Sequence, residues 1–248
     1  MSAPDWLTRI PIAHRGLHNA SHGIVENTIS AAKAAISKGY SIECDVQVSA
    51  DGVVMVFHDD TLDRLTDRSD PFEQLKANEL SSLTLRNSTE NIPTLETFLK
   101  FVDGQVPIIC EIKSKFDGNL GLVRQTAGII KNYQGHLALK SFDPEVVTAV
   151  SKLAPNRPRG FIGESTYDDA EWNFLSESQK TAMANLKNID EMRPHFLSWY
   201  IKDIEHGPPQ LARKALGLQL MTWTVRNVND QSKAVAYADQ IVFEGFTP

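Results

Sequence analysis

The sequence predicts an α/β protein that forms a single (β/α)8 barrel over residues 1–248. Short runs rich in β-branched residues alternate with longer amphipathic segments, which is the pattern of βαβ units around a parallel sheet. One short run reads as the arm of a local hairpin, and setting it aside leaves eight candidate strands, the number that closes such a barrel. The chain length of 248 residues also fits the roughly 250 residues of this fold.

The candidate strands are short and apolar. Asp51-Gly52 stands between two of them and is a hairpin-turn signal, so the run 53–57 is expected to pair with the strand before it. The predicted strands are 10–14, 41–48, 53–57, 106–112, 136–140, 159–162, 195–200, 219–224 and 240–243.

Helical patterns separate most of these strands, and several begin with a capping residue. Asn27-Thr28, Thr94 and Asp143-Pro144 each precede an amphipathic run, as expected of helix N-termini. The predicted helices are 28–38, 94–102, 120–133, 144–153, 176–186, 203–216 and 227–237. The polar stretch 59–92 is predicted to be an insertion or long loop over the barrel mouth, with a short helix near 71–83.

Composition limits the classes of function. Hydrophobic residues make up 42% of the chain and charged residues 23%, as in ordinary soluble proteins. A formal net charge of -6 argues against general nucleic-acid binding, although a local cationic pocket can still bind an anionic small molecule. No secretory signal or apolar run of about 18 residues is visible, so the expected location is cytoplasmic, without a transmembrane segment. The oligomeric state stays open.

Three carboxylates occupy strand positions that point to the same face. Glu43 and Asp45 are two residues apart, so their Cα atoms lie roughly 6.6 Å apart on one side of the strand. Glu111 follows from the next strand, and the carboxyl ends of barrel strands gather at one rim. Oxygen donors of this kind favour Mg²⁺ or Ca²⁺, so the sequence predicts a divalent metal site. Cys44 and Cys110 then face the helices as buried, reduced thiols.

Two histidines, His14 and His58, also follow apolar runs. An imidazole exchanges protons near neutral pH, so the pair could act as base and acid in displacement at phosphorus. The alternative is that each is a metal ligand or a hydrogen-bonded core histidine. The other five histidines are predicted to be surface or loop residues: His18, His22, His136, His195 and His206.

Cationic and aromatic side chains accompany these groups. Arg15 and Lys113 are candidates for phosphate binding, or for ion pairs with the carboxylates. Lys113 could instead form a Schiff base, but a neighbouring Glu111 would raise the lysine pKa and disfavour that chemistry. Trp223 could be a wall for the carbon skeleton of the substrate or a packing residue. Arg64 and Arg68 are expected to pair with loop aspartates.

In combination, the motifs resemble the glycerophosphodiester phosphodiesterase family, and the resemblance covers nearly the whole chain. The matching motifs are His14-Arg15-Gly16, Glu26-Asn27-Thr28, Glu43-Cys44-Asp45-Val46, His58-Asp59, Thr61-Leu62-Asp63-Arg64, Ile92-Pro93-Thr94-Leu95-Glu96, Glu111-Ile112-Lys113, Ser141-Phe142-Asp143 and Trp223-Thr224-Val225. The stretch 167–194 carries no such signal.

The resemblance implies a TIM barrel with a small insertion after the second strand. It implies a Ca²⁺ or Mg²⁺ ion on Glu43, Asp45 and Glu111, acid/base catalysis by His14 and His58, and phosphate binding by Arg15 and Lys113. The implied reaction is hydrolysis of a glycerophosphodiester to glycerol 3-phosphate and an alcohol, by direct water attack or through a cyclic phosphate.

The C-terminus departs from this pattern. The family usually ends on a strand followed by Thr-Asp, whereas this chain has Phe243-Glu244. Two other functions remain: a phospholipase D-like lyase that releases a cyclic phosphate, and a barrel that binds phosphate esters without turning them over. The missing secretion signal argues against the lyase, and the complete set of histidines and carboxylates argues against loss of catalysis.

Overall fold

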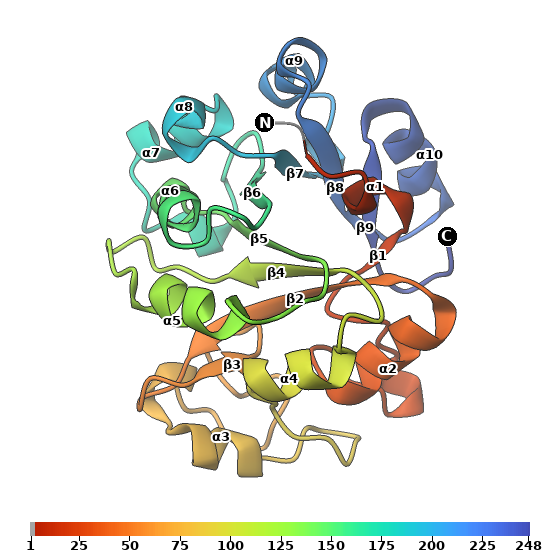
Figure 1. The fold of residues 1–248 in the computed structure, drawn as a ribbon, viewed down its shortest axis with the longest axis vertical. Coiled ribbons are helices and arrows are strands. Elements are labelled where there is room, and N and C mark those ends of the chain that lie inside the picture. The colour runs from red at the N-terminus through yellow and green to blue at the C-terminus, as the bar shows by residue number, and fades with distance from the viewer. Residues whose placement is uncertain (1–2) are drawn as a thin grey trace.

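Eight parallel strands close into a barrel in the computed structural model, which describes residues 3–248 (Figure 1). β1 pairs with both β2 and β9, which closes the ring. β3 (Val54–Val56) pairs antiparallel with β2 and lies outside the ring, as the hairpin signal predicted. The barrel strands are β1 (Ile12–Ala13), β2 (Ser41–Val48), β4 (Ile108–Ile112), β5 (Leu137–Ser141), β6 (Arg159–Gly163), β7 (Phe196–Tyr200), β8 (Gln219–Val225) and β9 (Gln240–Phe243).

Helices follow most barrel strands and cover the outside of the ring (Figure 1). The main ones are α2 (Ile29–Lys38), α4 (Leu95–Val102), α5 (Gly121–Ile130), α6 (Pro144–Leu153), α7 (Glu177–Ala184), α9 (Gly207–Leu216) and α10 (Val228–Tyr237). The expected caps form: Thr28 accepts from the Ala31 amide, Thr94 from that of Thr97, and Asp143 from that of Glu145.

Two helix predictions need correction at their ends. The helix expected from residue 203 begins at Gly207, because Pro208 and Pro209 suit a first turn but cannot donate hydrogen bonds inside a helix. The helix expected to reach residue 133 ends at Ile130. Two short helices were not predicted, α1 (Trp6–Arg9) and α8 (Ile189–Met192), since four residues give no readable periodicity.

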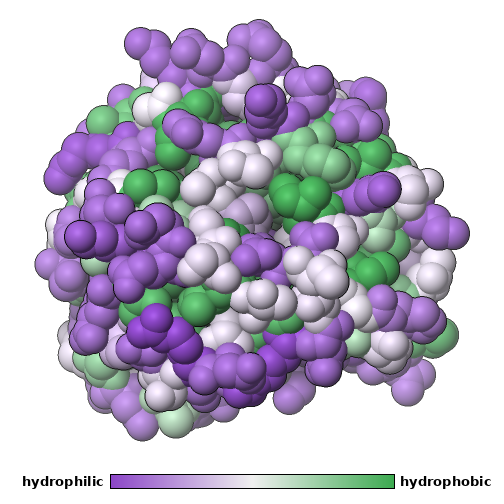
Figure 2. Space-filling view, turned by 90° about the horizontal axis from the view of Figure 1, so that it is seen from below, coloured by the Kyte–Doolittle hydropathy of each residue, from purple (hydrophilic) through white to green (hydrophobic). Residues whose placement is uncertain are grey.

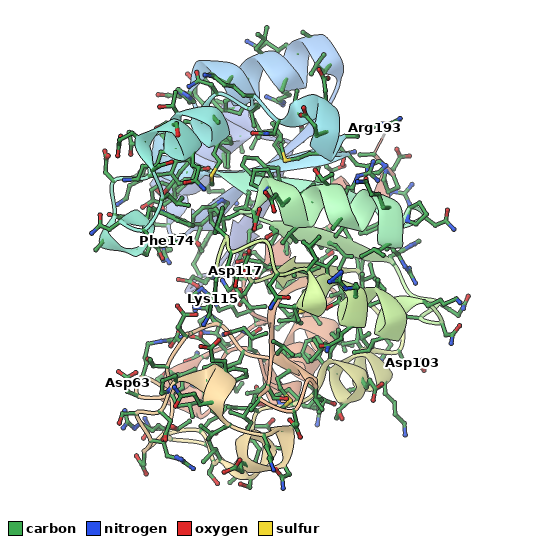
Figure 3. All side chains as sticks on the ribbon, turned by 90° about the vertical axis from the view of Figure 1, so that its left-hand side faces the viewer. Asp63, Asp103, Lys115, Asp117, Phe174 and Arg193 are labelled. Atoms are coloured by element: carbon green, nitrogen blue, oxygen red, sulfur yellow. The ribbon has the colours of Figure 1, made fainter. Side chains whose placement is uncertain are left out.

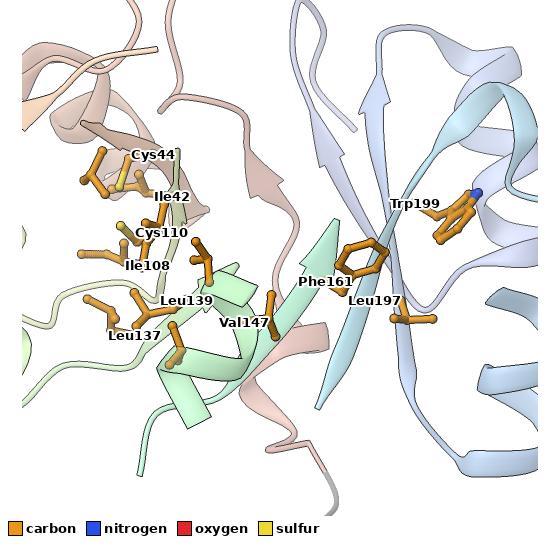
Figure 4. Packing of buried hydrophobic residues seen from close by; sticks show 14 of the residues in the cluster. Ile42, Cys44, Ile108, Cys110, Leu137, Leu139, Val147, Phe161, Leu197 and Trp199 are labelled. Atoms are coloured by element: carbon orange, nitrogen blue, oxygen red, sulfur yellow. The ribbon is translucent and has the colours of Figure 1, made fainter. Parts of the chain in front are cut away.

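The main core lies between the strands and the outer helices. Ile42, Cys44, Ile108 and Cys110 point outward from β2 and β4 into this layer (Figure 4). Both cysteines are buried and free, which confirms the prediction of reduced thiols. A smaller cluster fills the barrel interior at its N-terminal end, where Leu7 from α1 joins it. Because Ile109 and Glu111 share a face of β4, the interior is apolar at one end and charged at the other.

Residues 59–92 fold around a cluster of their own. A 3-10 turn (Phe72–Gln74) and α3 (Ala77–Ser82) lie near the helix predicted at 71–83. Phe57 stacks on Phe72 with ring centroids 5.1 Å apart. The cluster contains Val25, Met55, Phe57, Leu62, Phe72, Leu75, Leu80, Leu85 and Ile92. The face of the molecule on the α3 side is mostly hydrophilic (Figure 2), since these apolar side chains point inward.

The barrel interior depends on close packing at one glycine. A Cβ atom on Gly160 would fall inside van der Waals contact of the Phe196 ring from the neighbouring strand. We expect Gly160→Ala to lower the free energy of unfolding by about 1–3 kcal/mol, the usual cost of overpacking. Urea denaturation followed by circular dichroism measures this change.

Gly128 on α5 supplies the matched control. A Cβ atom there meets nothing within 4 Å, so Gly128→Ala should be neutral or stabilising. Equal effects of the two substitutions would contradict the packing argument.

Candidate active site

The C-terminal ends of the barrel strands surround a cavity of about 480 Å³. Seven of the eight predicted site residues line it: His14, Arg15, Asp45, His58, Glu111, Lys113 and Trp223. The eighth, Glu43, is fully buried directly beneath, two residues before Asp45 on β2. Figure 3 views the molecule from the side to which the β4 arrow points in Figure 1, with Phe174 above Lys115 and Asp117, and Asp63 below them.

The three predicted metal-ligating carboxylates meet inside the barrel. Asp45 on β2 lies in register with Glu111 on β4, and Glu43 is one inward position deeper. One oxygen from each of Glu43, Asp45 and Glu111 lies within 4.8 Å of the other two. The three side chains therefore form one buried acidic cluster rather than separate strand-end caps.

Three cations offset the charge of this acidic cluster. Lys113 Nζ lies 3.0 Å from Asp45 Oδ1 and 2.6 Å from Glu111 Oε1. Lys140 Nζ lies 3.0 Å from Glu43 Oε1 and 3.7 Å from Glu111 Oε2. Arg15 Nε lies 3.6 Å from Asp45 Oδ2, and the Arg15 amide donates to Glu43 Oε2.

Lys140 was not predicted from the sequence. Its position is in register with Glu111 and Gly160, on the inward face of β5. The signal was a lysine in the otherwise apolar run Leu137–Ser141, at the phase that points into the barrel.

The charges of this cluster shift the pKa values of its members. Burial alone raises the pKa of Asp45, but Lys113, His58 and Arg15 together hold that pKa well below its usual value. Burial also raises the pKa of Glu111, but nearby cations, mainly Lys113, hold that pKa below its usual value. Burial favours neutral Lys113, but the charges of Asp45 and Glu111 raise the pKa of Lys113 above its usual value. A Schiff-base lysine needs the opposite shift, which argues against the aldolase alternative.

Each predicted catalytic histidine is held by a carboxylate. His14 Nδ1 lies 2.5 Å from Glu244 Oε2, and His58 Nδ1 lies 2.7 Å from Asp59 Oδ1. An ionised carboxylate only accepts, so each Nδ1 donates and Nε2 is the ring nitrogen left for a substrate. Burial raises the pKa of Asp59, but hydrogen bonds from His58 and Arg64 bring that pKa well below its usual value.

Glu244 is a second residue of the candidate site that was not predicted from the sequence. It was noted only as a departure at the C-terminus, yet its carboxylate contacts His14, His18 and Arg226. Burial by itself raises the pKa of Glu244, but these three partners hold that pKa well below its usual value. The neighbouring Phe243 packs in the core against Tyr40. The altered motif therefore keeps a carboxylate at the rim and changes its length.

A second ring of polar contacts fixes the cluster. Asn27 Nδ2 donates to Asp45 Oδ2 at 2.9 Å, and the Asp45 amide donates back to Asn27 Oδ1. Glu26 accepts from Arg15 and from Arg64, and Arg64 also pairs with Asp59. Burial opposes the ionisation of Glu26, but Arg64 and Arg15 lower its pKa to about 2.

These contacts test two smaller predictions. Arg64 and Arg68 pair with the aspartates Asp59 and Asp70, as expected. Among the other histidines, the prediction for His195 was wrong: it is buried, and its Nδ1 accepts from the Arg159 amide. The alternation of apolar and polar residues along one strand does not show which neighbouring strand will bury a residue at the end of that strand, and His195 is such a residue.

The opposite side of the cavity is aromatic and acidic. Trp223 lines it while its Nε1 donates to the Ser198 carbonyl at 3.0 Å. Glu164, directly after β6, is also in the lining and is only 6% exposed. Burial, with the charges of Asp203, Glu171 and Asp169, raises the pKa of Glu164 to about 7. Glu164, Asp169 and Glu171 lie in or next to the stretch 167–194, which carried no recognisable motif, whereas Trp223 belongs to a matching motif.

Within the described residues 3–248, no helix is long and apolar enough to cross a membrane. The relatives found by sequence comparison include two enzymes that each share 28% identity with this chain. Glycerophosphodiester phosphodiesterase 1 of Bos taurus matches over 89% of this chain and 73% of its own length. The glycerophosphodiester phosphodiesterase of Caldanaerobacter subterraneus subsp. tengcongensis matches over 90% and 88%.

Among solved structures, an Oleispira antarctica phosphodiesterase in complex with the product sn-glycerol-3-phosphate has a TM-score of 0.77 at 22% identity. The match covers 96% of this chain and 93% of that one, and it confirms the barrel fold. A family model described as the glycerophosphoryl diester phosphodiesterase family matches residues 14–243, from the first cavity histidine to the last barrel strand. The chain therefore belongs to the glycerophosphoryl diester phosphodiesterase family of hydrolases.

Proposed function

We propose that this protein hydrolyses glycerophosphodiesters to glycerol 3-phosphate and an alcohol. The observation that carries the proposal is the joint presence, in one cavity, of two carboxylate-held histidines and a buried cluster of three carboxylates. The names of the relatives agree with it, and so does the product bound to the Oleispira antarctica enzyme.

We propose that Glu43, Asp45 and Glu111 hold a divalent cation, Ca²⁺ or Mg²⁺. The donor set fits because it consists only of oxygens that already converge within 4.8 Å. Glu43 Oε1 is also buried without an aligned hydrogen bond, its contact with Lys140 being an ion pair only. When bound, the cation would neutralise negative charge on the phosphate oxygens.

The two histidines are proposed to move the protons. One Nε2 takes the proton of the attacking hydroxyl, from water or from the glycerol, and the other gives a proton to the departing alkoxide. Glu244 and Asp59 keep each ring in the tautomer that leaves Nε2 toward the cavity and stabilise the ring after it gains a proton. Arg15 and Lys113 supply fixed positive charge for the phosphate.

Two other functions use the same residues. A lyase would stop at the cyclic phosphate, and a binding protein would release no product. A single incubation with a glycerophosphodiester distinguishes the three functions by their products. Only the hydrolase yields glycerol 3-phosphate.

Chelation tests the proposed cation. EDTA should abolish release of glycerol 3-phosphate from glycerophosphocholine or glycerophosphoethanolamine, and added Ca²⁺ or Mg²⁺ should restore it. Coupled assay of glycerol 3-phosphate measures this. Full activity in EDTA, after dialysis against the chelator, would remove the cation from the reaction.

Substitution tests the histidine pairs. His14→Ala and His58→Ala should each lower kcat by about 10²-fold or more, the usual loss of acid/base help. Glu244→Gln should lower kcat more than it changes KM, because the ring loses its counter-charge, and Glu244→Asp should retain more activity than Glu244→Gln. Wild-type kcat in any of the first three variants would exclude that residue from the mechanism.

Stability tests the ion pairs independently of turnover. Lys140→Met leaves Glu43 as a buried charge without its partner, which should cost about 3–5 kcal/mol of unfolding free energy. Ca²⁺ or Mg²⁺ should raise the urea midpoint of this variant more than that of the wild type, because the cation replaces the missing charge. Lys131→Met, at an exposed position after α5, is the control. An equal response in all three proteins would contradict a cation site in the cluster.

A further inference from the structure

The cavity has two chemically different sides because they come from opposite strands of the barrel. In the ring order, β1 lies across from β6, and β2 lies across from β7. The side formed by β1, β2, β4 and β5, together with the segment after β3, supplies both histidines, the acidic cluster and its cations. The β6, β7 and β8 side supplies Glu164, Tyr200 and Trp223, and the segment after β6 adds Trp172 and Phe174.

The rings of this second side are in contact with one another. Trp223 lies 5.1 Å from Tyr200 and 5.4 Å from Phe142, measured between ring centroids. Phe142 lies 4.9 Å from Trp172, and the series continues to Phe174 at 6.4 Å. The Lys202 ammonium lies over the face of the Tyr200 ring, 5.5 Å from its centroid, so one ring of this series already contacts a cation.

Three acidic side chains lie among these rings and form no ion pair with a lysine or arginine of the described residues. Glu164 is more than nine-tenths buried, lines the cavity, and has a buried Oε1 with no hydrogen-bond partner among the described residues. Asp169 and Glu171 also line the cavity. Within residues 3–248, none of these three carboxylates lies within 4 Å of a lysine or arginine nitrogen. An ionised carboxylate buried in this way costs free energy, and a ligand that brings positive charge offsets that cost.

We propose that this aromatic–acidic wall, formed by Phe142, Trp172, Phe174, Trp223, Glu164 and Glu171, binds an alkylammonium group on the leaving alcohol of the substrate. The inference rests on the proposed function and specifies it: the preferred diesters carry a choline-like or ethanolamine-like alcohol. Aromatic faces attract such cations, and most strongly where water is excluded. The phosphate of the same molecule then meets Arg15 and Lys113 on the opposite side.

The acidic groups decide between this ligand and the other classes that aromatic rings bind. An acyl chain or neutral alcohol would cover Glu164 and remove its water without supplying a counter-charge. A leaving alcohol that carries a negative charge, such as a second phosphate group, would be repelled by Glu164, Asp169 and Glu171. A cationic alcohol gives both the ring faces and the carboxylates a favourable partner.

A pair of isosteric substrates tests the proposal. Glycerophosphocholine is compared with the glycerophosphodiester of 3,3-dimethylbutanol, which replaces the quaternary nitrogen by carbon and keeps the shape. We expect kcat/KM to be about tenfold or more higher for the choline ester, and Glu164→Gln to bring this ratio toward one. Phe174→Leu, at a position 57% exposed, should also lower the ratio.

Controls separate this inference from the proposed function. Glu177→Gln removes an exposed charge on α7 outside the cavity and should leave the ratio as in the wild type. Equal kcat/KM for the two esters, or preference for the neutral one, would overturn the inference while the proposed function stands. No hydrolysis of either ester would overturn the proposed function, and binding of tetramethylammonium then tests the wall directly. Quenching of tryptophan fluorescence that is weakened in Glu164→Gln supports the wall, and no difference between the proteins overturns it.

Discussion

Neutralisation of three buried carboxylates by three cations is the interaction on which the rest of the structure depends. Asp45, Glu111 and Lys140 stand in one row across β2, β4 and β5, and the Arg15 side chain reaches the row from the end of β1. Charges buried this deeply are tolerated only when opposite charges lie beside them. Four strands must therefore hold one register, and barrel closure through the β1–β2 pairing is what brings Arg15 to Asp45.

The same closure builds one of the two histidine pairs. His58 is held by its chain neighbour Asp59, a contact that a short segment forms alone. His14 is held by Glu244, 230 residues away, and the two meet because β1 lies beside β9. The Phe243 carbonyl accepts from the His14 amide, which fixes the spacing between the two segments. The two imidazole–carboxylate pairs therefore have different origins: the His58–Asp59 pair forms locally, and the His14–Glu244 pair requires the closed barrel.

The cavity combines a polar, ion-paired side with an aromatic one. The polar side comes from the first half of the barrel, where most of the readable motifs lie. The aromatic side uses strand ends of the second half and the segment around Trp172, which folds as a 3-10 turn (Ala170–Trp172) against Phe142 and Tyr167. A division of this kind lets chemistry stay fixed on one side while the residues that contact the leaving alcohol vary on the other.

The sequence by itself determined the barrel, its hairpin arm, the helix caps and the convergence of Glu43, Asp45 and Glu111, because strand alternation and rim position follow from local periodicity. Tertiary structure alone decided the partners of Lys140 and Glu244 and the burial of Glu164 in the cavity wall. Strand alternation predicts which face of β5 carries Lys140. Only the order of the neighbouring strands shows that Glu43 and Glu111 point into the same part of the barrel interior and pair with Lys140. The physical reason is that pairing energies between distant segments depend on strand register and closure, which no short window of residues contains.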